Sequence, residues 1–358
     1  MNNFLKIVND KGIEKLPFMP CFDDYAKSGL PEKYREQHVI DLQVQFESDM
    51  LRGVEAYKET FKSPVKYKKE RKGEYETEIY ETPIGNLKRV ARFMKESPFI
   101  PFPTEYLIKS TEDLKIFRYV LENTIVEEDF SRMEHYMKKY PGKIMSASMQ
   151  DSPFYDLLTK QVGIENFTFL FMEDPTELEL TMEAMMETKK QYLDLSAKSP
   201  ADVVICYENT NTANSMPDWI KAYGFKFLNE FADIAHKYDT PLLIHMCGKI
   251  SLLLEEIAEC KFDGIIDISP PPTGDIDFAK AIKVMEKAEK MIIGGIECNQ
   301  FIMKDTEDFT KSVEKFLETL PESPYFFLGS GDAVPQGVSF ENMKAATDIT
   351  KKRPRVGL

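Results

Sequence analysis

From residue 143 onward, short apolar runs alternate with amphipathic segments. The runs predict seven buried strands, at residues 143–148, 167–171, 202–207, 241–245, 264–268, 291–296 and 325–328. Nearly continuous apolar strands that alternate with helices indicate parallel strands covered by helices. We therefore expect an α/β fold, a (β/α)8 TIM barrel. Periodicity alone leaves an open doubly wound sheet as the alternative, but no glycine-rich phosphate-binding pattern supports a dinucleotide fold.

The first hundred residues are less regular and predict an N-terminal helical and β-hairpin appendage. Residues 16–22 read as a short apolar strand, and helical stretches follow through Arg52. The alternation at residues 74–79 leads into the turn sequence 82–86, which is typical of a hairpin. We expect a single domain over residues 1–358, with the appendage and first strand in 1–105 and the main barrel in 106–358.

Two helix starts are clear in the middle of the chain. Ser110 and Asp113 have the spacing of a capping box, which predicts a helix until about Tyr140. Asp174 followed by Pro175 combines an N-cap carboxylate with proline at the first helical position, which predicts a helix to about Ala197.

Charge and composition exclude several classes of partner. A net charge of −14 repels a phosphate backbone, so no nucleic acid is expected. The densest basic run, residues 66–72, reads as a solvated hairpin edge. No apolar run approaches the roughly 20 residues that span a bilayer, so we expect a cytoplasmic protein with no membrane contact. Five widely spread cysteines do not form a disulfide framework.

Polar residues follow the predicted strands, where the active site of a (β/α) barrel lies. His245 and Cys247 end one apolar run and are separated by one residue. In an extended segment their side chains point to the same face, and Gly248 then lets the chain turn. Imidazole and thiolate together suit zinc. The alternative is a buried histidine beside a small apolar cysteine.

Further candidate ligands and catalytic groups follow other strands. Cys298 would complete a three-ligand zinc site with an open fourth position. Glu208 and Asp332 are candidates for the remaining ligand, for a group that orients a ligand, or for a general acid or base. Both can also be helix-capping or surface carboxylates. The candidate substrate-binding residues at the same rim are Gln150, Tyr207, Asn209 and Asn299.

The segment TPLLIHMCGK at 240–249, together with FDGI at 262–265, resembles the His-x-Cys-Gly region of cobalamin-dependent methyltransferases in the uroporphyrinogen decarboxylase superfamily. The likeness extends to residues 82–86, 223–225 and 294–296 and implies a TIM barrel. True uroporphyrinogen decarboxylases carry an arginine-rich segment near the N-terminus, which grips the acidic tetrapyrrole. The corresponding residues 17–24, PFMPCFDD, are acidic, so the methyltransferase branch, similar to methylcobalamin:coenzyme M methyltransferases, fits better.

The resemblance implies zinc and a corrinoid as cofactors. The corrinoid would come on a separate partner protein, because this chain has no Asp-x-His-x-x-Gly pattern for carrying it. In the coenzyme M methyltransferases the third zinc ligand is a cysteine in a Gly-Cys-Gly segment after the last strand, where this chain has Gly-Asp-Ala at 331–333. Either Asp332 replaces that thiolate or Cys298 supplies sulfur, and we favour Cys298 because its softness matches Cys247.

The expected activity is transfer of a methyl group between the corrinoid and a small substrate. Two thiolates on zinc favour a thiol acceptor bound as thiolate, whereas a harder ligand set favours a methyl ether or methylamine-type donor. The alternatives are a uroporphyrinogen decarboxylase-like lyase acting on a small carboxylic acid, and a non-catalytic binding barrel.

Overall fold

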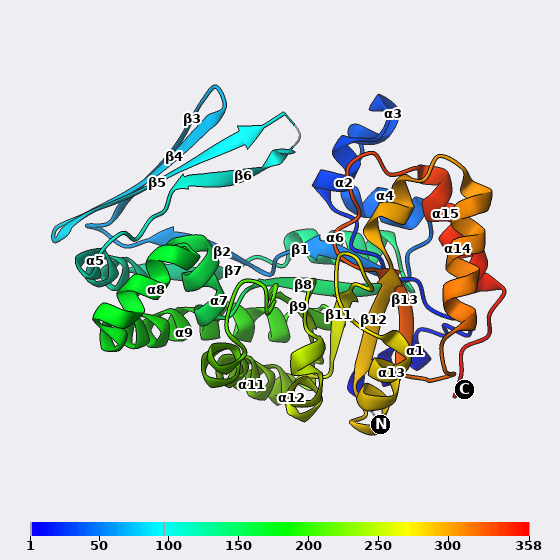
Figure 1. Cartoon of the computed structure of the whole chain (residues 1–358). Helices are drawn as coiled ribbons and strands as arrows, with labels where there is room; N and C mark the ends of the chain where they lie inside the picture. The colour runs from blue at the N-terminus through cyan, green and yellow to red at the C-terminus, as the bar shows by residue number, and fades with distance from the viewer. Residues whose placement is uncertain (1, 96, 358) are drawn as a thin grey trace.

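A curled sheet of seven parallel strands forms the centre of the molecule (Figure 1). The computed structural model describes residues 2–95 and 97–357. The strand order is β1 (Met50–Val54), β8 (Ile144–Gln150), β9 (Val203–Tyr207), β10 (Leu242–His245), β11 (Gly264–Ile268), β12 (Met291–Ile296) and β13 (Phe326–Ser330). The expected α/β fold with a parallel sheet is confirmed, and six of the seven strands predicted beyond residue 142 form where the apolar runs lie.

The predicted strand at residues 16–22 lies between the two edges of this sheet but is not a continuous strand. Phe18 bridges Leu328 of β13, and the Phe18 carbonyl accepts a hydrogen bond from the Asp49 amide at 2.9 Å, just before β1. Pro17 and Pro20 have no N–H group to donate, so a full ladder cannot form here. The segment thus takes the place expected of an eighth strand through isolated bridges, beside seven regular strands.

The amino-terminal end of the sheet is closed by the first helix, α1 (Asn3–Asp10). Phe4 and Val8 of α1 are fully buried in one apolar cluster with residues from the beginnings of the strands, among them Met50 and Phe327. The rings of Phe4 and Phe327 lie 6.3 Å apart. Because apolar side chains fill this end of the sheet, we expect the polar functional groups at the opposite, carboxyl end of the strands.

Helices follow most strands and cover the outside of the sheet (Figure 1). Both predicted helix starts are confirmed: Ser110 forms a capping box with Asp113, and the Asp174 side chain accepts from the Glu177 amide. The α-helices after α1 are α2 (Asp24–Ser28), α3 (Glu32–Arg35), α4 (Val39–Gln45), α5 (Thr111–Glu122), α6 (Ser131–Lys139), α7 (Pro153–Asp156), α8 (Ile164–Glu173), α9 (Pro175–Lys198), α10 (Pro217–Trp219), α11 (Phe225–Ala235), α12 (Leu254–Glu259), α13 (Phe278–Lys287), α14 (Thr306–Glu318) and α15 (Phe340–Lys351). The shorter helical turns are η1 (Leu157–Gln161), η2 (Ile220–Gly224), η3 (His236–Tyr238), η4 (Ser251–Leu253) and η5 (Cys298–Ile302).

The predicted hairpin appendage is present as a separate antiparallel sheet, which projects away from the parallel sheet in Figure 1. Its strands are β3 (Lys66–Lys72), β4 (Tyr75–Thr82), β5 (Gly85–Met94) and β6 (Ser97–Glu105). Every residue of β3 is exposed and the strand pairs on one side only, which confirms the basic run as a solvated edge. None of the described helices combines the length and the apolar character that crossing a bilayer requires.

Three sequence-based assignments were wrong. Residues 167–171 lie in helix α8, where Phe167 and Leu170 are buried at helical spacing; a short apolar run cannot distinguish strand from buried helix. The helix expected from Ser110 to Tyr140 is interrupted, because β7 (Thr124–Glu128) pairs with β2 (Tyr57–Phe61). Residues around Arg52 form β1 rather than the end of a helical stretch.

Candidate metal centre and active site

His245 and Cys247 lie at the carboxyl end of β10, as the sequence predicts. His245 is the last residue of the strand and is 3% exposed, while Cys247 is half-buried. Gly248 follows with a φ of +98°, a left-handed conformation that favours glycine. An added Cβ there would lie 2.5 Å from the Asn211 side chain, so the turn that positions Cys247 depends on glycine in two ways.

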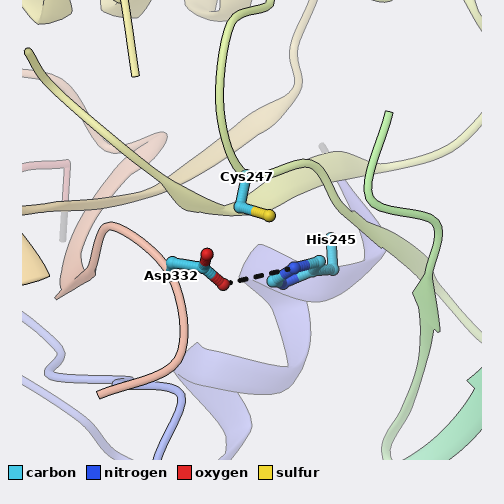
Figure 2. A group of neighbouring side chains, drawn as sticks. All are labelled: His245, Cys247 and Asp332. Atoms are coloured by element: carbon cyan, nitrogen blue, oxygen red, sulfur yellow. Dashed lines mark ion pairs between the residues drawn. The ribbon is translucent and has the colours of Figure 1, made fainter. Parts of the chain in front are cut away.

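Asp332 completes a compact group with these two residues. One ligand atom from each of His245, Cys247 and Asp332 lies within 4.8 Å of the other two. Figure 2 shows the three side chains facing a common centre, with Asp332 arriving from the loop after β13. The His245 Nε2 and Asp332 Oδ1 atoms are 3.7 Å apart. Nitrogen, sulfur and oxygen donors gathered in this way are a suitable ligand set for a zinc ion.

A buried ion pair holds the imidazole of His245 from behind. The His245 Nδ1 and Asp267 Oδ2 atoms are 2.7 Å apart, and Asp267 also accepts hydrogen bonds from Arg52 Nη1 at 2.8 Å and Nη2 at 2.6 Å. Asp267 is fully buried; burial alone would raise its pKa, but Arg52 and His245 lower the pKa to about 2. A permanently charged carboxylate on Nδ1 leaves Nε2 facing Cys247 and Asp332, the arrangement common to metal-binding histidines.

The sequence analysis missed Asp267 and Arg52. Asp267 is the one charged residue in β11, a strand otherwise made of glycine and isoleucine, and Arg52 is the one charged residue in β1. A charged side chain inside a buried strand demands a partner, so this signal was available in the sequence. Both residues lie inside apolar runs, whereas the ligand candidates follow such runs.

The protonation of the two residues on β10 is shifted by their surroundings. Burial would lower the pKa of His245, but the neighbouring Cys247 and Asp267 outweigh it and raise that pKa well above its ordinary value. Burial raises the pKa of the Cys247 thiol, while His245 opposes the shift. A metal ion binds the thiolate of cysteine and an unprotonated nitrogen of histidine, so metal binding at this pair would be coupled to proton release.

Asn209 and Tyr207, both predicted to bind substrate, lie directly against the group. The Asn209 Oδ1 atom is 2.9 Å from His245 Nε2 and 3.3 Å from Cys247 Sγ. The Tyr207 ring centroid is 5.6 Å from that of His245, and its hydroxyl accepts from Arg52 Nε at 3.3 Å. Burial raises the pKa of Tyr207 to about 12, so its hydroxyl stays protonated.

Cys298 and Asn299 lie at the beginning of η5, after β12. Cys298 is half-buried, and burial followed by the nearby charge of Asp332 raises its pKa. The compact group formed by the described residues contains His245, Cys247 and Asp332 but not Cys298. Asn299 is exposed and donates from Nδ2 to Glu297 Oε1 at 3.2 Å, which holds it against its own loop.

Glu208 follows β9 and is fully buried. Its carboxyl group accepts hydrogen bonds from the amide and the hydroxyl of Ser152. Burial, reinforced by the charge of Asp151, raises the pKa of Glu208 to about 8. A carboxyl group with such a pKa is protonated at neutral pH and is suited to proton transfer.

Gln150 ends β8 and pairs in register with Tyr207 on β9. It is exposed and lines a cavity of about 190 Å³ that also includes Lys189, Tyr192 and residues of the antiparallel sheet. Gln150 is thus two strands away from His245 on the same rim, since β8, β9 and β10 are successive neighbours.

The molecule is an α/β protein, and a group of side chains that could hold a metal ion lies at the carboxyl ends of its parallel strands. The chain belongs to the uroporphyrinogen decarboxylase (URO-D) family, whose model matches residues 107–353. A uroporphyrinogen decarboxylase from Hydrogenobaculum sp. (strain Y04AAS1) is 23% identical over 189 residues. The match covers 52% of this chain, and the chain spans about half the length of that curated relative, 51%.

Among solved structures, a methyltransferase from Methanosarcina mazei is similar to nearly the whole molecule. The TM-score is 0.60, and the match covers 98% of this chain and 99% of that chain at 13% sequence identity. A likeness at this identity establishes a shared fold. The superfamily expected from the sequence is confirmed by the family model that matches residues 107–353.

Proposed function

We propose that this protein is a zinc-dependent methyltransferase that moves a methyl group between a corrinoid and a small substrate. The observation that carries the proposal is the meeting of His245, Cys247 and Asp332, whose ligand atoms all lie within 4.8 Å of one another at the carboxyl ends of two strands. Family membership and the fold shared with a methyltransferase support the same reading.

The residues present fit a zinc ion. One imidazole, one thiolate and one carboxylate are typical zinc ligands, and three protein ligands leave the open position that catalytic sites keep. We propose His245, Cys247 and Asp332 as the ligands, with Cys298 as the alternative to Asp332. When bound, the ion would supply Lewis acidity, lowering the pKa of a coordinated thiol or polarising a methyl donor.

The protein's own groups have distinct tasks in this proposal. Asp267 keeps a proton on His245 Nδ1 and so directs Nε2 into the site. Glu208, with its pKa of about 8, holds a proton that can be delivered to a leaving group or taken back from an acceptor. Asn209 and Tyr207 border the ligand atoms and are placed to orient a substrate.

The corrinoid supplies the chemistry of carrying the methyl group, and we propose that it arrives on a partner protein that docks at the barrel mouth. The small substrate is either a thiol acceptor or a donor of the methyl ether or methylamine type. A carboxylate in place of a second thiolate leaves zinc more electrophilic, which favours a methyl donor.

Two measurements test the proposal. Elemental analysis should find about one zinc per chain in the wild-type protein and far less in Cys247→Ala, while Cys260→Ala, at a buried cysteine following α12, keeps its metal. Full zinc occupancy in Cys247→Ala would rule out the site. The second measurement follows demethylation of methylcobalamin with a panel of thiols, and methylation of reduced cobalamin by aryl methyl ethers and methylamines.

The competing activity is that of a lyase acting on a small carboxylic acid, which the family name and the Hydrogenobaculum relative favour. Its substrate would need a free cation at the mouth. Arg52 does not provide a free cation, because its charge is neutralised by Asp267. The N-terminal segment contributes a carboxyl group, Asp23, instead of a cation. No methyl movement with either panel, together with release of carbon dioxide from a carboxylic acid, would favour the lyase.

A further inference from the structure

The cavity of about 190 Å³ beside Gln150 lies where the antiparallel sheet meets helices α5 and α9. In Figure 1 this sheet stands above the two helices. None of His245, Cys247 and Asp332 lines the cavity, so it is separate from the metal centre. The proposed methyl transfer does not use its wall, which makes the cavity a candidate site for a ligand of its own.

Two elements turn one regular face toward this cavity. Glu59 and Phe61 alternate on β2, so their side chains point to the same side of the strand. Met185, Thr188 and Tyr192 recur every three or four residues on α9 and lie on one face of that helix. The cavity is thus enclosed by a strand and a helix, whose backbones have a fixed geometry.

Aromatic side chains supply a large part of the wall. The described aromatic residues that line the cavity are Phe61, Tyr80, Phe117 and Tyr192. The ring centroids of Phe61 and Tyr80 are 5.5 Å apart, and the two rings are nearly perpendicular, at 89°. Such rings offer an apolar surface, and their faces attract cations. The wall therefore suits an organic cation better than an anion.

The charge of the wall is negative, and the excess lies on Glu59. Three carboxylates and two cations line the cavity. Lys189 Nζ is 2.7 Å from Asp156 Oδ2, and Arg89 donates to Glu78, so both cations are already paired. Within the described part of the chain Glu59 forms no ion pair, and its exposure leaves the carboxylate open to a ligand. A bound cation would balance this charge.

Thr188 brings a buried hydroxyl group to the same wall. The residue is 4% exposed, and its hydroxyl has no hydrogen-bond partner among the described residues. This hydroxyl is not one of the unpartnered polar atoms that are closed off from solvent, so it is accessible from the cavity. Tyr192, about one turn further along α9, donates its hydroxyl hydrogen to Glu59. The Thr188 hydroxyl and the Glu59 carboxylate thus occupy neighbouring positions of the wall.

We propose that this cavity binds a small primary alkylammonium ion. The ammonium group donates hydrogen bonds to the Glu59 carboxylate and the Thr188 hydroxyl, which are both able to accept them. The alkyl chain packs against Phe61, Phe117 and Met185. A carboxylate ligand would meet the charge of Glu59 and would find both cations of the wall already paired. This site does not depend on the proposed methyl transfer.

The probe is n-pentylammonium, titrated into the full chain by calorimetry. It is compared with n-pentanol, which has a similar shape and no charge. We expect saturable binding of pentylammonium that is about tenfold or more stronger than that of pentanol, because hydrogen bonds to charged groups are the stronger ones. Equal binding of the two probes, or no binding of pentylammonium, would overturn the proposal.

Glu59→Gln should lose the preference for pentylammonium, because the amide keeps the size of the carboxylate but not its charge. Glu127→Gln is the matched control. Glu127 lies opposite Lys58 on the paired strand β7, so it is on the other face of the two-stranded sheet and should not affect binding. Equal losses in the two variants would indicate a general attraction to surface charge and would reject the proposal.

A third variant tests the buried hydroxyl without changing the charge. Thr188→Val keeps the shape of the side chain and removes its acceptor, so pentylammonium binding should weaken about threefold or more. Circular dichroism checks that all three variants keep the fold. Wild-type affinity in both Glu59→Gln and Thr188→Val would place the ligand outside this cavity and overturn the proposal.

Discussion

The Nδ1 atom of His245 lies 2.7 Å from the Oδ2 atom of Asp267, buried at the carboxyl end of the parallel sheet. Asp267 has a φ of +66° and is bound through both oxygens to Arg52. Three strands, β1, β10 and β11, thus contribute one charged or ionisable side chain each to a single buried chain of hydrogen bonds. The imidazole is fixed before any metal binds, which is the condition for a preorganised ligand.

Asp267→Asn should damage both stability and metal binding. The substitution leaves the buried Arg52 without its charge partner, and such a loss costs about 3 kcal/mol or more. It also weakens the bond that orients His245, so zinc affinity should fall roughly 10- to 100-fold. Urea denaturation of the metal-free protein gives the first quantity, and competition with a chromogenic chelator gives the second.

A second histidine–aspartate pair in the same chain provides the matched control. The His236 Nε2 and Asp263 Oδ2 atoms are 2.8 Å apart at the amino end of β11, remote from the metal centre. Asp263→Asn should lower stability without changing zinc affinity. If Asp267→Asn also bound zinc like the wild type, the proposed orienting role of Asp267 would be incorrect.

The third ligand can be identified by comparing two variants. Asp332→Ala should lower zinc affinity by about tenfold or more, because Asp332 Oδ1 already lies 3.7 Å from His245 Nε2. Cys298→Ala should change it much less, since the Cys298 sulfur is outside the compact ligand group. Substitution of Zn²⁺ by Co²⁺ gives a second reading, because each thiolate ligand adds a charge-transfer band. If Cys298→Ala lowered zinc affinity more than Asp332→Ala, Cys298 would be the third ligand.

The turn after Cys247 gives a prediction about ligand placement. Gly248→Ala introduces a side chain at a φ of +98° and crowds Asn211, so the loop must shift and zinc affinity should fall. The backbone strain alone costs about 1–2 kcal/mol. Gly12→Ala is the matched control, since Gly12 has a φ of +67° and nothing within 4 Å of the added atom. Only Gly248→Ala should alter the chelator competition; equal zinc binding in both variants would contradict this prediction.

The strands of the parallel sheet could be predicted well because their apolar runs are fully buried. Residues 264–268 and 291–296 form β11 and β12 with the expected bounds. The run at residues 167–171 failed, since Phe169 and Met172 of α8 are exposed and only one helix face is covered. The apolar content of a five-residue run does not distinguish a fully buried strand from a helix that is buried on one face. Residues 16–22 have the apolar pattern of a strand, but Pro17 and Pro20 cannot donate ladder hydrogen bonds, and only isolated bridges form.

The residues of the candidate site that follow strands could be predicted from the sequence. The residues that orient His245 from within strands could not. His245, Cys247 and Asp332 each follow or end an apolar run, so the rule of strand ends found them. Asp267 and Arg52 lie within β11 and β1, and the sequence places them 215 residues apart. Their pairing depends on the curl of the sheet, which brings β1 and β11 across the mouth from each other and which no local pattern encodes.

Glu208 makes the stability of the protein depend on pH in an unusual direction. Its pKa is raised from 4.5 to about 8 by burial and by Asp151, with Ser152 and Lys189 opposing the shift. The folded state therefore keeps a proton that the unfolded state releases above about pH 4.5. The contribution of Glu208 is fully favourable below that pH and is lost as pH rises through 8, at about 1.4 kcal/mol for each pH unit between these values.

Glu208→Gln removes this titration while keeping a similar shape. The stability of the wild type relative to Glu208→Gln should fall between pH 5 and pH 8, measured by urea denaturation across that range. Asp151→Asn should shift the fall to lower pH, because removing the Asp151 charge lowers the pKa of Glu208 toward its ordinary value. A difference between wild type and Glu208→Gln that stays constant with pH would show that Glu208 is ionised in the folded protein, and its proposed role as a proton carrier would then have to be abandoned.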